Sequence, residues 1–175
     1  MRSTPKEISE IQNARGGIST NFASIEYFIA QFITTHYFNG PNETFLAEVF
    51  EDEYFSFGLL AKIFDKVLQQ YPEEYKKFPM QKLRRLQKLR NIIVHARLQS
   101  VVKLDRGGER IQEIGETYFH HAGKDQKVVD VFREYEKLRV VVQPAVVGLP
   151  GVSEQIERVE LLRSDSTQND ALESG

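Results

Sequence analysis

Three residues near the middle of the chain, Arg90, Asn91 and His95, combine the side chains that phosphate chemistry needs. A histidine exchanges a proton near neutral pH, so His95 can serve as a general base or a general acid. The guanidinium of Arg90 carries a permanent charge and a fork of donors that suits a phosphate in its transition state. Asn91 lies four residues before His95, hence on the same helix face, and could orient the imidazole or the phosphate. These residues form the candidate catalytic group.

The position of Arg90 around the helix is harder to reconcile with such a site. At about 100° per residue, Arg90 lies about 140° from His95, toward the side of Leu86 and Ile93. Three arrangements would account for this. The helix deforms near its end, Arg90 reaches into a dimer cleft, or Arg90 is a buried structural arginine with an acidic partner.

The charge of the chain is unevenly distributed. Lys and Arg number 23 against 25 Asp and Glu, a net charge of −2, yet the bases gather in residues 76–97, which contain no acid. A local basic block favours a polyanion or an acidic partner surface. We expect four of its side chains to bind a nucleic-acid backbone: Lys77, Arg84, Arg85 and Lys88. The alternatives are a solvated face, or pairing of Arg84 and Arg85 with the acidic segment 43–53 of the same or another subunit.

A helical wheel places part of this basic block beside the histidine. Arg84 and Lys88 fall within about 40° of His95. Lys77 joins them only if the helix continues back through Pro79. A stripe of this kind is a plausible track for a phosphate backbone.

Hydrophobic spacing predicts a mainly helical bundle with a small β-hairpin inserted before the last long helix. The expected helices span residues 6–15, 18–38, 42–50, 55–70, 73–78, 79–96 and 125–143. Gly16-Gly17 is expected to interrupt or kink the first of them, and Pro144 with Gly148-Leu149-Pro150-Gly151 to end the last. After Ala96 the period changes to two, which predicts strands at 100–104, 109–114 and 116–121 and a hairpin turn at 105–108.

Length and composition restrict the remaining possibilities. A chain of 175 residues suits one domain with a tail, so we expect a helical domain over residues 1–151 and a short helix with a disordered tail over 152–175. There is no cysteine, which excludes disulfides and thiolate zinc sites. No apolar run is long enough to span a membrane, and the N-terminus lacks an apolar signal core, so the expected location is cytoplasmic.

No metal site is expected either. His120 and His121 are neighbours on a predicted strand, so their side chains should point to opposite faces of it, which makes a poor pair of ligands. No carboxylate cluster accompanies the candidate catalytic group, which disfavours a two-metal nuclease.

The run from Arg90-Asn91 to His95, Arg-Asn-x-x-x-His, resembles the signature of HEPN-domain proteins, small helical bundles that usually dimerise. The resemblance covers about residues 6–145, since Phe55–Phe64 is similar to the helix that precedes the motif in many small bacterial members, and a closing helix follows. It implies a HEPN-like bundle and a homodimer in which two motifs face each other across a cleft. It also implies RNA cleavage without a metal or cofactor, by attack of the ribose 2′-OH on the adjacent phosphate.

The resemblance leaves two kinds of function open. An active member would be an endoribonuclease, such as a toxin or an anti-phage defence component, with an antitoxin or regulatory protein as a further partner. Arg97 stands two positions after the histidine, where toxins neutralised by nucleotidyltransferase antitoxins often have tyrosine, so the chain departs from that pattern of control. The alternative is a non-catalytic HEPN-like dimeric module that binds a protein or nucleic acid, including a regulator of the mannitol-repressor type.

Overall fold

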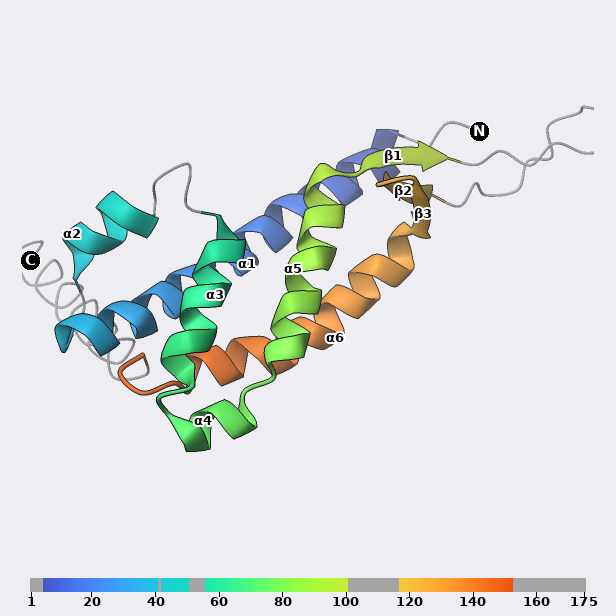
Figure 1. Ribbon diagram of the computed structural model, residues 1–175. Coiled ribbons are helices and arrows are strands. Elements are labelled where there is room, and N and C mark those ends of the chain that lie inside the picture. The colour runs from blue at the N-terminus through green and yellow to red at the C-terminus, as the bar shows by residue number, and fades with distance from the viewer. Residues whose placement is uncertain (1–4, 41, 51–55, 101–116, 153–175) are drawn as a thin grey trace, which may run out of the picture. The chain divides into compact units, whose positions relative to one another are not determined.

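The computed structural model describes residues 5–40, 42–50, 56–100 and 117–152. It confirms a mainly helical chain with a small antiparallel sheet before the last long helix (Figure 1). The elements are α1 (Pro5–Phe38), α2 (Glu43–Phe45), the π-helical turn η1 (Leu46–Phe50), α3 (Phe57–Leu68), α4 (Pro72–Lys77), α5 (Met80–His95), β1 (Arg97–Ser100), β2 (Thr117–His121), β3 (Lys124–Lys127) and α6 (Val128–Val147). They divide into two compact units, Met1–Ser24 with Pro79–Val142, and Ile25–Phe78 with Gln143–Gly175.

The first unit contains α5, the helix that carries the candidate catalytic group. Its four expected core residues are all fully buried: Leu83, Leu86, Leu89 and Ile93. Pro79, expected at the first helical position, instead caps the helix from the position before it. The helix ends at His95, and the extended backbone of Ala96 (φ −68°, ψ 147°) leads directly into β1. The sequence therefore predicted this helix to within one residue at each end.

The sheet has the order β1-β2-β3 and lies at the C-terminal end of α5 (Figure 1). Ala122 and Gly123 join β2 to β3 with φ values of 49° and 75°, the two positive angles of a type I′ hairpin turn. Residues 125–127 were expected to begin the last helix, and that expectation is wrong, because this turn folds them back as β3. Strand β1 begins at Arg97, earlier than expected, and the turn and strand predicted between 105 and 114 lie outside the described residues.

The N-terminal part of α1 belongs to the same unit, and it continues without a break through Gly16-Gly17. The expected interruption is therefore wrong. Each glycine costs a helix roughly 0.5–1 kcal/mol, but Ile18 and Phe22 are buried on the turns that follow. The hydroxyl of Tyr135 on α6 also donates to the Ile18 carbonyl over 3.3 Å. Tertiary packing here outweighs local helix propensity.

The second unit has an aromatic core. The Phe64 ring packs against Phe32 and Phe78 with centroids 5.7 and 5.0 Å apart. Asn42 accepts a hydrogen bond from the Phe45 amide, which confirms it as a helix N-cap. Pro144, expected to end the last helix, lies inside α6 instead, and Val146 beyond it is fully buried.

No helix within the described residues is long and apolar enough to cross a membrane. The predicted tail falls outside the described residues from position 153 onward.

Candidate nucleic-acid site

His95 is the last residue of α5 and is exposed to solvent. A histidine in this position interacts favourably with the negative end of the helix dipole when it is protonated. Within the described part of the chain, no hydrogen bond or ion pair holds its ring. The imidazole is therefore accessible to a ligand from solvent.

Arg90 reaches around α5 toward the face that carries His95. Its Nη1 donates to the amide oxygen of Asn91 over 3.1 Å, and Asn91 stands one turn before the histidine. The helix itself remains regular from Met80 to His95, so a deformation near its end is not the explanation. Instead, the length of the arginine side chain carries the guanidinium toward the Asn91 side, although the two residues are adjacent in sequence.

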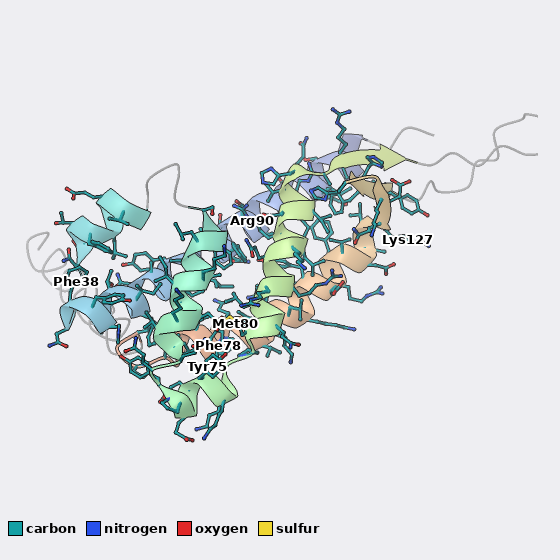
Figure 2. All side chains as sticks on the ribbon, in the orientation of Figure 1. Phe38, Tyr75, Phe78, Met80, Arg90 and Lys127 are labelled. Atoms are coloured by element: carbon teal, nitrogen blue, oxygen red, sulfur yellow. The ribbon has the colours of Figure 1, made fainter. Side chains whose placement is uncertain are left out.

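The same guanidinium is packed against α1, toward which Arg90 points (Figure 2). The guanidinium carbon lies 5.6 Å from the centre of the Phe22 ring, a cation–π contact. Its Nε is buried and makes no hydrogen bond to any described group. None of the described acids pairs with this arginine either.

A second arginine, Arg15 on α1, secures the end of α5 and was missed by the sequence reasoning. Its Nη2 donates to the Ala96 carbonyl over 2.7 Å, and its guanidinium lies over the Phe119 ring at 5.2 Å. Burial lowers the pKa of Arg15 from its ordinary value. A signal did exist: the helix ends without a glycine, so its last carbonyls need donors from elsewhere. Only the fold reveals that the donor lies 81 residues away.

The four residues expected to bind nucleic acid differ in the helix that carries them and in their contacts. Arg84 and Lys88 are exposed on α5, as a phosphate track requires. Arg85 is exposed as well, and its Nε and Nη2 donate to the two carboxylate oxygens of Glu134 on α6 over 2.7 and 2.8 Å. Lys77 is the last residue of α4, a separate helix, because the chain leaves that helix at Phe78 and α5 begins only at Met80.

The Arg85–Glu134 pair predicts a small pH-dependent stability. The hydrogen bond from Arg85 lowers the pKa of the Glu134 carboxyl below its ordinary 4.5. A carboxyl group with a lowered pKa stabilises the fold above pH 4.5, and this contribution is lost as the pH falls through the lowered value. We expect Glu134→Gln to lower the free energy of unfolding at pH 7, measured in urea, by less than about 1 kcal/mol, since the two side chains are 46% and 44% exposed.

The matched control for this prediction is Glu136→Gln. It breaks a bond with Arg139 within one helical turn, worth only about 0.2–0.5 kcal/mol. The Glu134→Gln and wild-type stabilities should converge in acid. A difference that persists unchanged below pH 3 would mean that the charge pair is not its cause.

No family is established for this chain. Comparison with protein-family models, with curated proteins and with solved structures gives no match. Within the described residues there is no group of three or more His, Cys, Asp or Glu side chains that could hold a metal ion. What the site can do therefore follows from its own residues.

Proposed function

We propose that the protein is a metal-independent endoribonuclease of the HEPN type that acts as a homodimer. The observation that carries the proposal is the 3.1 Å hydrogen bond from Arg90 to Asn91. It supports a convergence of the guanidinium, the amide and the exposed imidazole of His95 on one side of α5. Charge stabilisation and proton transfer are the two functions that cleavage of a phosphodiester by a neighbouring hydroxyl requires.

In this reaction the 2′-oxygen of a ribose attacks the adjacent phosphorus. The 2′-OH loses its proton to the His95 ring, the bond from phosphorus to the 5′-oxygen breaks, and the 5′-oxygen gains a proton. Arg90 stabilises the charge that develops on the phosphate oxygens, and Asn91 holds the guanidinium in place through its amide oxygen. The exposed cations Arg84 and Lys88 guide the strand along α5. The products are a 2′,3′-cyclic phosphate and a 5′-hydroxyl.

The homodimer belongs to the proposal for two reasons. Each motif supplies one histidine, whereas the reaction moves two protons. The resemblance to HEPN proteins also implies two motifs facing each other across a cleft. A role as a toxin or an anti-phage defence component, with an antitoxin or regulatory partner, is the biological setting that this resemblance suggests.

The test is cleavage of single-stranded RNA in excess EDTA, with the ends of the products identified. We expect cleavage that leaves 2′,3′-cyclic phosphate or 3′-phosphate ends, together with a dimer in light scattering at micromolar concentration. DNA, which lacks the 2′-OH, should not be cut. Cleavage that requires a divalent metal, or a species that remains a 20.2 kDa monomer, would argue against the proposal.

The basic stripe makes a second, separable prediction. If Lys88 contacts a phosphate, RNA binding should weaken steeply with salt, and Lys88→Ala should reduce the slope of log K against log salt by about one. Lys137→Ala is the matched control, because it removes a lysine that is also exposed, from α6. Fluorescence anisotropy at several salt concentrations measures both slopes. Equal slopes for the two variants would identify the stripe as a solvated face.

A specific observation keeps the non-catalytic alternative in consideration. Arg90 is half-buried and packed on the Phe22 ring, as a structural arginine would be. On this alternative the chain is a HEPN-like dimeric module that binds a protein or nucleic acid, of which a mannitol-repressor-like regulator is one form. Protein that binds RNA but never cleaves it, with the motif intact, would favour this function.

A further inference from the structure

The outer face of the small sheet carries a row of three chemically active residues. Arg97 of β1 stands directly opposite His120 of β2, which stands directly opposite Asp125 of β3. Directly paired residues of antiparallel strands project from the same face. Phe119, the neighbour of His120, is fully buried and packs on Phe132, so the row faces away from the core.

Asp125 fixes the orientation of the imidazole in this row. Its carboxylate oxygen lies 2.7 Å from Nδ1 of His120. An ionised carboxylate can only accept, so Nδ1 donates and the exchangeable position of the ring is Nε2. The side chains of His120 and Asp125 are 40% and 53% exposed, which leaves Nε2 within reach of a polymer in solvent. An oriented imidazole beside a guanidinium can bind phosphate and exchange a proton with it.

The row lies next to the end of α5. Only Ala96 separates His95 from Arg97, so their Cα atoms are at most about 7 Å apart. Directly opposed residues of antiparallel strands have Cα atoms about 5 Å apart. The backbones of His95 and His120 are therefore within about 12 Å of each other in one chain, and both side chains are exposed to some degree.

We infer that His120, oriented by Asp125, supplies the second proton of the cleavage reaction, and that Arg97 holds the phosphate between the two histidines. The inference rests on the proposed ribonuclease function. His95 takes the proton of the 2′-OH as the new bond to phosphorus forms. His120 gives its Nε2 proton to the 5′-oxygen as the bond from phosphorus to that oxygen breaks. One chain then contains both proton-transfer groups, so on this inference the second proton needs no second subunit, and the expectation of a homodimer follows from the resemblance to HEPN proteins alone.

Among the described residues of the sheet, two further titratable side chains lie on this face. Tyr118 of β2 and Lys127 of β3 form the adjacent pair in the register, on the same face as the row. Lys127 adds positive charge beside a bound phosphate, and Tyr118 offers a ring on which a base can stack. Asp125 is the carboxylate of the row, and it accepts a hydrogen bond from His120.

The first experiment tests the acid role with two substrates. A dinucleotide has a poor alkoxide leaving group that needs a proton, whereas uridine 3′-(4-nitrophenyl phosphate) releases a stable nitrophenolate that does not. We expect His120→Gln to lower kcat on the dinucleotide by about 10²–10⁴-fold and to have little effect on the nitrophenyl ester. His95→Ala should slow both substrates. His121→Gln, on the opposite face of the same strand, is the matched control and should slow neither.

Two further readouts distinguish catalysis from structure. In a profile of kcat against pH, the rate of the wild type should fall at high pH, because a general acid must be protonated. This fall should be absent from the profile of His120→Gln. Asp125→Ala removes the acceptor that orients the ring, so kcat on the dinucleotide should fall while KM stays unchanged. Equal losses on both substrates in His120→Gln would overturn the inference.

A binding experiment separates this inference from the proposed function. The four histidines give four ring signals in NMR, which single variants assign. We expect uridine 3′-monophosphate to shift the signals of His95 and His120 with one saturation curve and to leave that of His121 in place. Shifts at His95 without His120 would overturn the inference and leave the proposed function standing. Shifts at both histidines in a protein that cleaves neither substrate would overturn the proposed function and the acid role together, leaving a phosphate site.

Mixing two inactive variants shows whether the two histidines act within one chain. In a mixture of His95→Ala and His120→Gln, no chain has both histidines. If the pair acts within a chain, the mixture stays inactive even after subunits exchange. Recovery of activity toward a quarter of the wild-type rate would place the two histidines on different subunits and overturn the single-chain arrangement.

Discussion

Replacing His95 with alanine is expected to lower the rate of RNA cleavage in EDTA by about 10²–10⁴-fold, the usual effect of removing a general acid or base. The expectation follows from the position of this residue at the exposed end of α5, where its ring can meet a ribose hydroxyl. The core of the helix lies in other residues, such as Leu89 and Ile93. The variant should therefore fold, dimerise and bind RNA like the wild type.

Circular dichroism, light scattering and anisotropy provide the controls for this loss. If expression of the wild type is toxic to cells, expression of His95→Ala should not be. Suppose instead that the wild type cuts no RNA and that His95→Ala unfolds. The histidine would then be structural, and the binding-module alternative would replace the ribonuclease.

Replacing Arg90 with lysine should lower the cleavage rate by about 10²–10³-fold, as expected for the loss of a preorganised electrostatic donor. Lysine keeps the charge and much of the aliphatic stem but loses the planar fork. The fork is what allows one guanidinium to stay on Asn91 and still face a phosphate. We choose lysine over alanine because Arg90 also packs on Phe22, and a truncation would mix catalysis with stability.

The matched control is Arg133→Lys, which makes the same chemical change at an exposed position on α6. Its cleavage rate and unfolding midpoint should equal those of the wild type. If Arg90→Lys cleaves at the wild-type rate but unfolds at lower urea, Arg90 supports the fold and not the reaction. Single-turnover rates and urea titrations of the same preparations separate the two outcomes.

The helix that carries the motif could be predicted from sequence because every local signal agrees along it. Its apolar residues recur at helical spacing, a proline precedes it, and a change of period follows it. Local agreement of this kind makes a boundary predictable. The exposure of His95 and of Lys88 follows from the same spacing, because both lie away from the buried stripe.

Strand β3 shows where such signals fail. Lys124–Lys127 contains no apolar residue, so neither period is visible in it. Its strand conformation comes from pairing with β2 and from the turn at Ala122-Gly123, of which only the glycine is a recognisable sign. The dyad of His120 and Asp125 depends on this pairing, which is why sequence reasoning considered the histidine only as a metal ligand.

The conformations of long side chains could not be predicted from the sequence either. A helical wheel gives the direction of the Cα–Cβ bond, and it places Arg90 far from His95. It does not give the torsion angles of a long side chain, which here carry the guanidinium to Asn91. Likewise, Arg15 meets the Ala96 carbonyl only because α1 and α5 come together in three dimensions.

The alanine at the β2–β3 turn weakens the hairpin that holds His120 and Asp125 together. Ala122 adopts a left-handed backbone (φ 49°), which costs a residue with a Cβ roughly 1–2 kcal/mol compared with glycine. Local opening of this hairpin is correspondingly easier, and it does not require the helices to unfold. Each opening would separate His120 from Asp125 and so remove the hydrogen bond that orients the imidazole. Binding of an RNA strand across the sheet would favour the closed hairpin, and the substrate would thereby help to assemble the group that acts on it.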